Sequence, residues 1–399
     1  MSERTSPLLR QVGAFLYPCL RAFWDPPALR QVVAVLHDGV VDWAGLLRVG
    51  REEALSPLLY RVLQGRDIAP PEIEEQLRQA YYGVAGHNSL MLHELTDVLE
   101  GLSAEGVPAL LVKGAALADT VYGDIGVRPM TDVDIMVPQG DVLLAQSVLV
   151  GLGYTSMAAE PWPGYSWRYQ HGVQFQRPSG QALPFWIGLH SRPFDIPYYE
   201  RIPVADWFSR ALPAPSTWSH ALIPSPEDHL VYLCGHLALH HQFAPGVLRL
   251  IDLTLVMQRS GRALDWQAIA SRATDWHLAL PVQRSLAWLE ELWPATLPSE
   301  AGPALDVLQP QPSERRVYHW VVVRPRSPAA YSLLALATMG SWHRRVRFLA
   351  ELAVPSPAYM RKRYCPQRPY LWPLMYLWRG ALALKGLYQR LALAVNRNK

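Results

Sequence analysis

Hydrophobic residues return every three or four positions along the first hundred residues and again through much of the second half of the chain. The pattern is clear at 29–36 and 76–106, and it resumes in several stretches after Ser225. This spacing places apolar side chains on one face of a helix. We therefore expect a helical N-terminal region and a helical C-terminal half.

The residues between these two parts show strand patterns instead. In 132–138 (DVDIMVP) polar and apolar positions alternate with a period of two, which is the period of a strand. The strand candidates are 109–114, 132–138, 172–176 and 184–190, with helical segments expected at 115–123 and 141–154. The middle of the chain is therefore expected to hold a sheet with helices between its strands.

Length and sequence breaks divide the chain into four parts. A chain of 399 residues is too long for one compact core and suits two or three domains. Gly106-Val107-Pro108 interrupts the helical pattern, and 308–314 (LQPQPSE) has the composition of a linker. The expected parts are a helical N-terminal region (1–103), a strand-containing core (104–215), a helical domain (216–307) and a basic, aromatic-rich helical segment (308–399).

Composition narrows the class of protein. Half of the residues are hydrophobic, which is enough to form sizeable cores. Cys19, Cys234 and Cys365 are odd in number and widely spaced, a pattern that fits a reducing compartment better than a disulfide framework. The first residues lack the pattern of a signal peptide, and no run of about 18 uncharged apolar residues occurs. We expect a cytoplasmic protein without a membrane span.

The charges are unevenly distributed. Arg315 to Lys399 contain 16 of the 37 basic side chains but one of the 34 acidic ones, Glu351, so this end carries +15 and the rest −12. We expect the basic segment to dock as a helical cap on the acidic body. Its mixture of Arg with Trp and Tyr also suits the anionic inner face of a membrane, or an acidic peptide or protein partner. Nucleic-acid-binding signatures are absent, so nucleic acid is not an expected partner.

Asp132 and Asp134 are the first candidates for chemistry. Carboxylates at i and i+2 of a strand point to the same face, and oxygen ligands of this kind suit Mg²⁺, which completes its shell with substrate phosphates. Such ions can stabilise an in-line phosphoryl displacement. Taken alone, a D-x-D pair is more often a solvated feature of a strand or turn.

The residues before the two aspartates change this interpretation. Lys113-Gly114 ends a strand and precedes a helix, and glycine allows a phosphate to approach the backbone closely. Arg128 lies four residues before Asp132, and a guanidinium can bind phosphate through two hydrogen bonds. The alternative is that Lys113 and Arg128 only pair with the acids. We expect both aspartates on one strand, facing Gly114 across a cleft.

The segment 111–138 resembles the signature of a poorly characterised bacterial nucleotidyltransferase family of the DNA-polymerase-β-like superfamily. The pattern of that family runs Leu-Lys-Gly, a helix with Leu, Tyr-Gly-Asp, and then Arg-Pro-x-x-Asp-hydrophobic-Asp. The matching positions are Lys113, Gly114, Leu117, Tyr122, Gly123, Asp124, Arg128, Pro129, Asp132 and Asp134. A weaker resemblance extends to the helices before Gly106, to 236–241 (HLALHH) with Asp252, and to 356–364 (SPAYMRKRY).

The resemblance implies an α+β fold, with a small mixed sheet in a nucleotidyltransferase core at 104–215 and helical regions on both sides. It implies that Asp132 and Asp134 hold Mg²⁺, which coordinates a nucleoside triphosphate, taken here as ATP. Lys113 and Arg128 would stabilise its phosphates, and Gly114-Ala115 would form the phosphate turn. Members of the family occur beside biosynthetic operons, so a peptide or a saccharide is a candidate acceptor.

Two departures from the family pattern matter. The superfamily favours Gly-Ser or Gly-Gly at the phosphate turn, whereas Ala115 lacks a hydroxyl donor. Active members also carry a third carboxylate two residues before a histidine, and in 186–190 (WIGLH) Gly188 stands at that position, before His190. His190 could contact a substrate phosphate, replace part of the missing base, or be an ordinary strand residue.

The primary hypothesis is Mg²⁺-dependent transfer of a nucleoside monophosphate to an acceptor hydroxyl, with release of pyrophosphate. The alternative is a degenerate member that binds a nucleotide, peptide or partner enzyme without turnover. A third reading, a membrane-surface adaptor, would rest on the basic segment alone. His236 and His240 are one helical turn apart, as in a zinc site, but no third ligand stands at a convincing spacing. We expect them to be histidines at the edge of the core.

Overall fold

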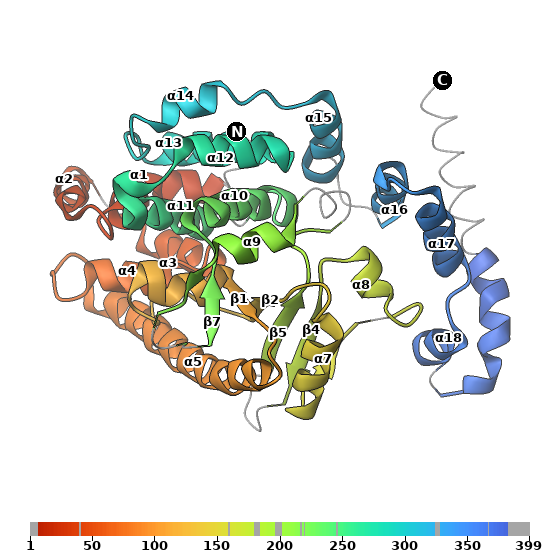
Figure 1. Cartoon of the computed structure of the whole chain (residues 1–399). Helices are drawn as coiled ribbons and strands as arrows, with labels where there is room; N and C mark the ends of the chain where they lie inside the picture. The colour runs from red at the N-terminus through yellow and green to blue at the C-terminus, as the bar shows by residue number, and fades with distance from the viewer. Residues whose placement is uncertain are drawn as a thin grey trace, which may run out of the picture.

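The chain folds around one mixed sheet that is covered by helices (Figure 1). The computed structural model describes residues 7–39, 41–158, 160–178, 184–195, 202–215, 218, 220–244, 246–323, 328–365 and 367–381. In this part of the chain the sheet consists of β1 (Ala109–Val112), β2 (Val133–Met136), β3 (Thr155–Ser156), β4 (Gly172–Arg177), β5 (Phe185–His190), β6 (Leu212–Pro213) and β7 (Ala221–Ile223). Their order in space is β3-β4-β5-β2-β1-β7-β6. The α+β class and the mixed sheet are confirmed.

The strands that carry the motif lie in the middle of the sheet. β2 pairs antiparallel with β1 and parallel with β5, and β5 pairs antiparallel with β4. Every residue of β1 and β2 is buried, including Asp134. The apolar sequence of β1 is typical of a strand covered on both faces. The helices between the strands are α6 (Lys113–Leu117), α7 (Val142–Gly151), α8 (Tyr165–Tyr169) and α9 (Val204–Arg210), with a π-helical turn η3 (Ala118–Tyr122) directly after α6.

The N-terminal region is helical, as the spacing of its apolar residues predicts. Its helices are α1 (Pro7–Arg21), α2 (Leu29–Asp38), α3 (Trp43–Glu52), α4 (Ser56–Leu63) and the 34-residue α5 (Pro71–Ala104), with a short 3₁₀ turn η2 (Pro26–Ala28) before α2. α5 ends at Ala104, two residues before Gly106, which has a left-handed φ of +70°, and the Val107 N–H donates back to the Leu102 carbonyl at 2.9 Å. This is a common way for glycine to end a helix. It turns the chain directly into β1.

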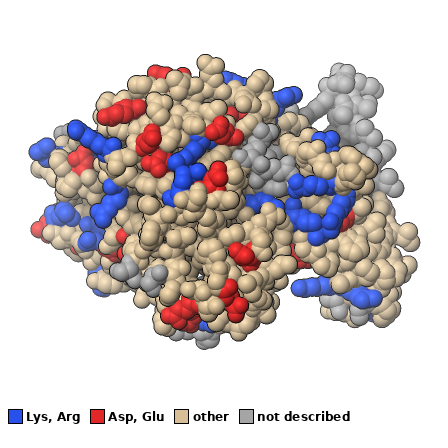
Figure 2. All heavy atoms as spheres, viewed as in Figure 1, with Lys and Arg blue, Asp and Glu red and all other residues tan. Residues whose placement is uncertain are grey.

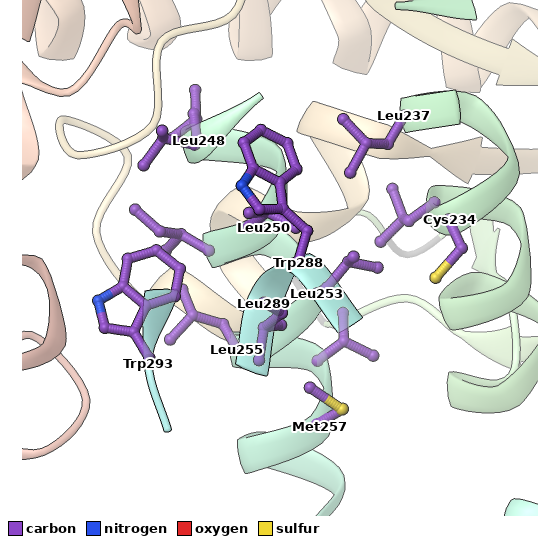
Figure 3. Packing of buried hydrophobic residues seen from close by; sticks show 14 of the residues in the cluster. Cys234, Leu237, Leu248, Leu250, Leu253, Leu255, Met257, Trp288, Leu289 and Trp293 are labelled. Atoms are coloured by element: carbon purple, nitrogen blue, oxygen red, sulfur yellow. The ribbon is translucent and has the colours of Figure 1, made fainter. Parts of the chain in front are cut away.

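A second helical layer follows the sheet. It contains α10 (Pro226–Gly235), the π-helical turn η5 (His236–His240), α11 (Val247–Ser260), a 3₁₀ turn η6 (Gly261–Ala263), α12 (Trp266–Asp275) and α13 (Ala279–Leu292). The Ser225 hydroxyl caps α10 by accepting from the Asp228 N–H at 3.3 Å. Figure 3 shows the interior of this layer, where Leu250, Leu253 and Trp288 pack together.

The last helices form a smaller lobe beside α8 (Figure 1). The connecting and terminal elements are α14 (Ala301–Asp306), α15 (Pro312–Tyr318), η7 (His319–Val323), α16 (Pro328–Thr338), α17 (Trp342–Ala353), α18 (Pro357–Tyr364) and η8 (Pro369–Leu371). Tyr165 and Tyr169 of α8 pack with Phe348 of α17.

The segment therefore contacts the body. Its acidic Glu351 pairs with Arg168 of the body at 2.9 Å. Figure 2 shows Lys and Arg side chains gathered where this lobe meets the rest of the molecule.

Two expectations from composition can be compared with the structure. Cys19, Cys234 and Cys365 are all free and buried. Among the described residues no helix is both long enough and apolar enough to cross a lipid bilayer.

Candidate active site

The two motif aspartates lie at the start of β2. Asp134 is the second residue of the strand, and Asp132 stands one residue before it. Val133 and Ile135 point to the opposite face, into the buried cluster beneath the sheet. The alternation in the sequence therefore places both carboxylates on one face, although the strand is shorter at its beginning than expected.

Lys113 lies directly beside Asp134. In the β1–β2 pairing Val112 is opposite Asp134, so the next residue, Lys113, reaches that carboxylate with 3.1 Å between its Nζ and Asp134 Oδ1. Lys113 has a left-handed φ of +55°, which costs about 1–2 kcal/mol for a residue with a Cβ. Strain of this kind is common where function fixes the direction of a side chain.

The charges of these three side chains are strongly coupled. Burial opposes the charge of Lys113, but Asp134 and Asp132 outweigh this effect and raise the pKa of Lys113 above its usual value. Burial also opposes the ionisation of Asp134, yet Lys113 and His190 hold the pKa of Asp134 well below its usual range. By contrast, burial and the charge of Asp134 raise the pKa of Asp132. The protein therefore does not fully compensate the negative charge of Asp132, a condition that a bound cation relieves.

Gly114 is required for the close approach of Arg128. A Cβ on Gly114 would lie 2.5 Å from Arg128 Nη1 and 3.0 Å from Met130 Cγ, and real Cβ atoms do not come so close. The remaining nitrogens of Arg128, Nε and Nη2, donate to Asp252 at 2.8 and 2.7 Å. Tyr122 also donates to Asp252, at 2.7 Å. Arg128 is thus held by a buried acid from α11, with Nη1 directed at the glycine turn.

Ala115 contributes to the turn only through its backbone. Its side chain is fully buried in the hydrophobic cluster beneath the sheet. A hydroxyl at this position would point into the core, so its absence removes nothing from the exposed face.

Gly188 lies where the missing carboxylate was expected. It is directly opposite Asp134 in the parallel pairing of β2 and β5. A Cβ built on Gly188 would be 2.7 Å from Asp134 Oδ1 and 3.1 Å from Gln174 Nε2. Gln174, opposite Gly188 on β4, donates to Asp132 at 3.1 Å, and its Oε1 is buried without a hydrogen bond to any described residue. A carboxamide therefore stands beside the two aspartates.

His190 forms the other side of this group. Its Nε2 is 2.6 Å from Asp134 Oδ1, and burial lowers the pKa of His190 to about 4 despite the favourable charge of Asp134. The ring is therefore neutral at pH 7 and donates to the carboxylate. It stacks on His171, whose Nδ1 is 2.6 Å from Asp195.

The other acids that could have filled the gap lie elsewhere. Asp195 is engaged by the ring and the backbone N–H of His171. Glu160 accepts from the Ser166 N–H at 3.3 Å, before α8. Among the described residues, the space beside Asp134 is occupied by His190 and Gln174.

Sequence reasoning missed Gln174 and the partner of Arg128. Gln174 lies in a strand candidate, and its polar side chain was the available signal. The sequence does not give the register of β4 on β5, which decides that this side chain faces the aspartates. Asp252 is an acid in an apolar helix, which was a signal for a buried ion pair. The sequence offered no third ligand at a convincing spacing for His236 and His240, and the structure brings a third imidazole, that of His241, into reach.

A cationic cavity of about 500 Å³ is lined by residues of α8 and α17, next to the place where these helices pack together. Its lining consists of Gln139, Trp167, Arg168, Tyr169, Arg192, Arg344 and Arg347. Glu351 already pairs with Arg168 at 2.9 Å and with Arg347 at 2.8 Å. The cavity combines positive charge with aromatic walls, and the C-terminal segment contributes one side of it.

An otherwise apolar sheet carries a small polar centre, which consists of Asp132, Asp134, Gln174, Lys113 and Arg128. It contains two carboxylates of unequal basicity, a carboxamide oxygen, a lysine with a restrained backbone and an arginine fixed by a buried acid. Such a set can bind a hard cation and an anionic group next to each other.

Comparison with known proteins agrees with this geometry. The model of a family described as uncharacterised nucleotidyltransferase matches residues 39–294, which is more than half of the chain and includes the whole polar centre. A comparison with curated proteins gave no match. The chain therefore belongs to this uncharacterised nucleotidyltransferase family.

Proposed function

We propose that the protein transfers a nucleoside monophosphate from a nucleoside triphosphate, with ATP as the donor to test first, to the hydroxyl of an acceptor, with the help of Mg²⁺. The observation that carries the proposal is the convergence of Asp132, Asp134 and Gln174 beside Lys113. Membership of a nucleotidyltransferase family supports the reaction class. The placement in the DNA-polymerase-β-like superfamily is part of the proposal.

The donor set fits Mg²⁺. This ion prefers oxygen ligands, and it usually binds one or two carboxylates while keeping water or phosphate in its other positions. Asp132 and Asp134 would supply the carboxylates. Gln174 donates to Asp132 through Nε2 at 3.1 Å. If its carboxamide turns over, Oε1, which is buried and without a hydrogen-bond partner among the described residues, would be a third oxygen in place of the carboxylate that Gly188 lacks. When bound, the ion neutralises charge on the triphosphate.

The cationic side chains would bind and orient the triphosphate. Lys113 is held at the carboxylates by its ion pair with Asp134, so its charge is already in position when the substrate arrives. Arg128 presents Nη1 at Gly114 while Asp252 fixes its other two donors. Positioning and charge stabilisation are the main contributions of a protein to phosphoryl transfer.

His190 would act as a positioning residue. A general base works best with a pKa near the working pH, whereas burial lowers the pKa of His190 to about 4. Its hydrogen bond to Asp134 instead orients one carboxylate oxygen and leaves the other for a cation. The proton of the acceptor hydroxyl would then pass to solvent water, because Asp132 would be engaged as a ligand of the ion.

The experiment is transfer of label from nucleotides labelled at the α-phosphate, with Mg²⁺ and candidate acceptors of peptide and saccharide type. We expect labelled product and pyrophosphate with the wild type and neither with Asp134→Asn. Label retained only as nucleotide across all acceptors, together with Mg²⁺-dependent nucleotide binding, would favour the second candidate below. Absence of nucleotide binding would contradict both.

The second candidate is a member that binds nucleotide without turnover. Gly188 favours it, because the residue opposite Asp134 on β5 carries no carboxylate. In this case the same cation and triphosphate contacts would serve recognition by a partner protein or peptide. The two candidates differ in one measurable respect, which is transfer to an acceptor.

A further inference from the structure

Three histidines form a compact cluster outside the polar centre. His236 begins the π-helical turn η5, His240 ends it, and His241 follows. One ring nitrogen from each residue can be chosen so that all three lie within 4.8 Å of one another. The centroids of the His236 and His240 rings are 4.9 Å apart with planes 8° from parallel, and the His241 ring meets both at steep angles.

The local backbone explains how six consecutive residues bring three imidazoles together. In a π-helical turn the bond runs from i+5 to i, and here the His241 N–H donates to the His236 carbonyl at 3.3 Å. The wider turn places both i+4 and i+5 over residue i. The next two residues, Gln242 and Phe243, have left-handed φ values of +50° and +65°. Strain at two residues in succession indicates that the surrounding fold holds this turn in place.

We propose that His236, His240 and His241 bind a transition metal ion of the Zn²⁺ type, as a second metal site that differs in chemistry from the aspartate pair. Neutral imidazoles are ligands for Zn²⁺, Co²⁺, Ni²⁺ and Cu²⁺, whereas Mg²⁺ requires oxygen. Three histidines with an open fourth position are a known arrangement for reactive zinc. The exposure of His240 leaves room for water or an acceptor group at that position.

Metal binding requires the His240 ring to turn, because the nearly parallel rings of His236 and His240 do not direct both lone pairs at one point. With Zn–N bonds of about 2.0–2.1 Å, tetrahedral ligands lie about 3.4 Å apart. The present separations of up to 4.8 Å can close through side-chain rotation, because His240 lies at the surface.

The cluster lies next to the polar centre. The His240 and His171 ring centroids are 6.3 Å apart, His171 stacks on His190 at 4.9 Å, and His190 contacts Asp134. A metal at the cluster would therefore border the site proposed for nucleotide transfer, where it could bind an acceptor. The metal site itself does not depend on that function.

The test uses full-length protein without a histidine tag, stripped of metal and titrated with Co²⁺ in excess Mg²⁺, which occupies any oxygen-ligand site. We expect one equivalent of Co²⁺ to bind with the visible absorption of imidazole ligation, and Zn²⁺ to displace it. His240→Ala should weaken binding by more than about 100-fold, because the loss of even an outer partner of a ligand costs about 10- to 100-fold. His93→Ala, which removes an exposed histidine of α5, should change nothing.

The remaining variants keep the result unambiguous. Asp132→Asn/Asp134→Asn should bind Co²⁺ like the wild type, which separates this site from the nucleotide site. His240→Ala removes a surface ring, so it tests the site even where His236→Ala disturbs folding. Equal Co²⁺ affinity in the wild type and in His240→Ala/His241→Ala, or no imidazole spectrum in the wild type, would overturn the proposal.

Discussion

Replacing Arg128 by methionine removes the guanidinium that pairs with Asp252 while keeping most of the side-chain volume. Asp252 is 1% exposed, and it accepts from Arg128 at 2.8 and 2.7 Å and from Tyr122 at 2.7 Å. The variant leaves the buried Asp252 carboxylate with the hydrogen bond from Tyr122. Breaking a buried ion pair in this way costs about 3–5 kcal/mol, so the free energy of unfolding should fall by about that amount.

Two further variants separate the effect of losing the ion pair from the effect of leaving a buried charge without its partner. Arg128→Met/Asp252→Leu removes both charges, and such replacements are often neutral or stabilising, so most of the lost stability should return. Arg48→Met is the matched control, because Arg48 pairs with Glu52 at 2.9 Å on the surface of α3. Its pair is exposed, and the expected cost is about 0–1 kcal/mol.

The assay is denaturant unfolding of all three variants, followed by nucleotide titration of those that fold. A cost below about 1 kcal/mol for Arg128→Met would refute the account of the buried pair. The double variant should be folded and yet bind ATP at least about tenfold more weakly, which corresponds to about 1.4 kcal/mol. Wild-type affinity in that variant would show that Arg128 has a structural role only.

Three other substitutions test the site. Gly114→Ala should displace Arg128 and weaken ATP binding about tenfold or more, because its Cβ would lie 2.5 Å from Arg128 Nη1. Gly140→Ala, which has open space around its Cβ, should bind ATP like the wild type in the same titration. Folding lowers the pKa of His190 from 6.5 to about 4, so the unfolded chain takes up the extra proton and the free energy of unfolding falls as the pH drops from 6.5 to 4. In unfolding curves over this range, His190→Gln should show a decline in that free energy that is smaller than in the wild type by up to about 3 kcal/mol. An identical decline in both proteins would contradict the lowered pKa of His190. Gly188→Asp alone should be destabilised, because its Cβ would lie 2.7 Å from both His190 Nε2 and Asp134 Oδ1. Combined with His190→Ala, which gives the Asp134 carboxylate room to move, it should tighten Mg²⁺ binding in calorimetry and, once an acceptor is known, raise turnover by about 10²- to 10⁴-fold. Unchanged Mg²⁺ affinity would show that position 188 does not face the ion.

The sequence predicted the central strands and the face of the aspartates well. Period-two alternation around Asp134 and the apolar run before Lys113 are local signals, and local signals fix which residues share a face. The position of Gly188 opposite Asp134 could be anticipated only because the resemblance supplied the order of the motif. The expected end of the first strand at Gly114 was close, since β1 stops at Val112.

The partners of the site residues could not be predicted, because they depend on tertiary contacts. Asp252 is 124 positions from Arg128, and nothing local to either residue specifies the pair. The register of β4 on β5 decides that Gln174 faces the aspartates. A π-helical turn brings His241 to His236, whereas ordinary helical spacing would direct the two side chains apart.

The most direct test of the account is ATP binding with and without Mg²⁺, measured by calorimetry on the wild type and on Asp132→Asn/Asp134→Asn. The wild type should bind ATP at least about tenfold more tightly with Mg²⁺ than with a chelator, a difference of about 1.4 kcal/mol. The double variant should show the same weak affinity in both conditions, because the ion has lost its carboxylates. Equal affinity of the wild type with and without Mg²⁺ would contradict the central claim that these two aspartates hold the cation that binds the triphosphate.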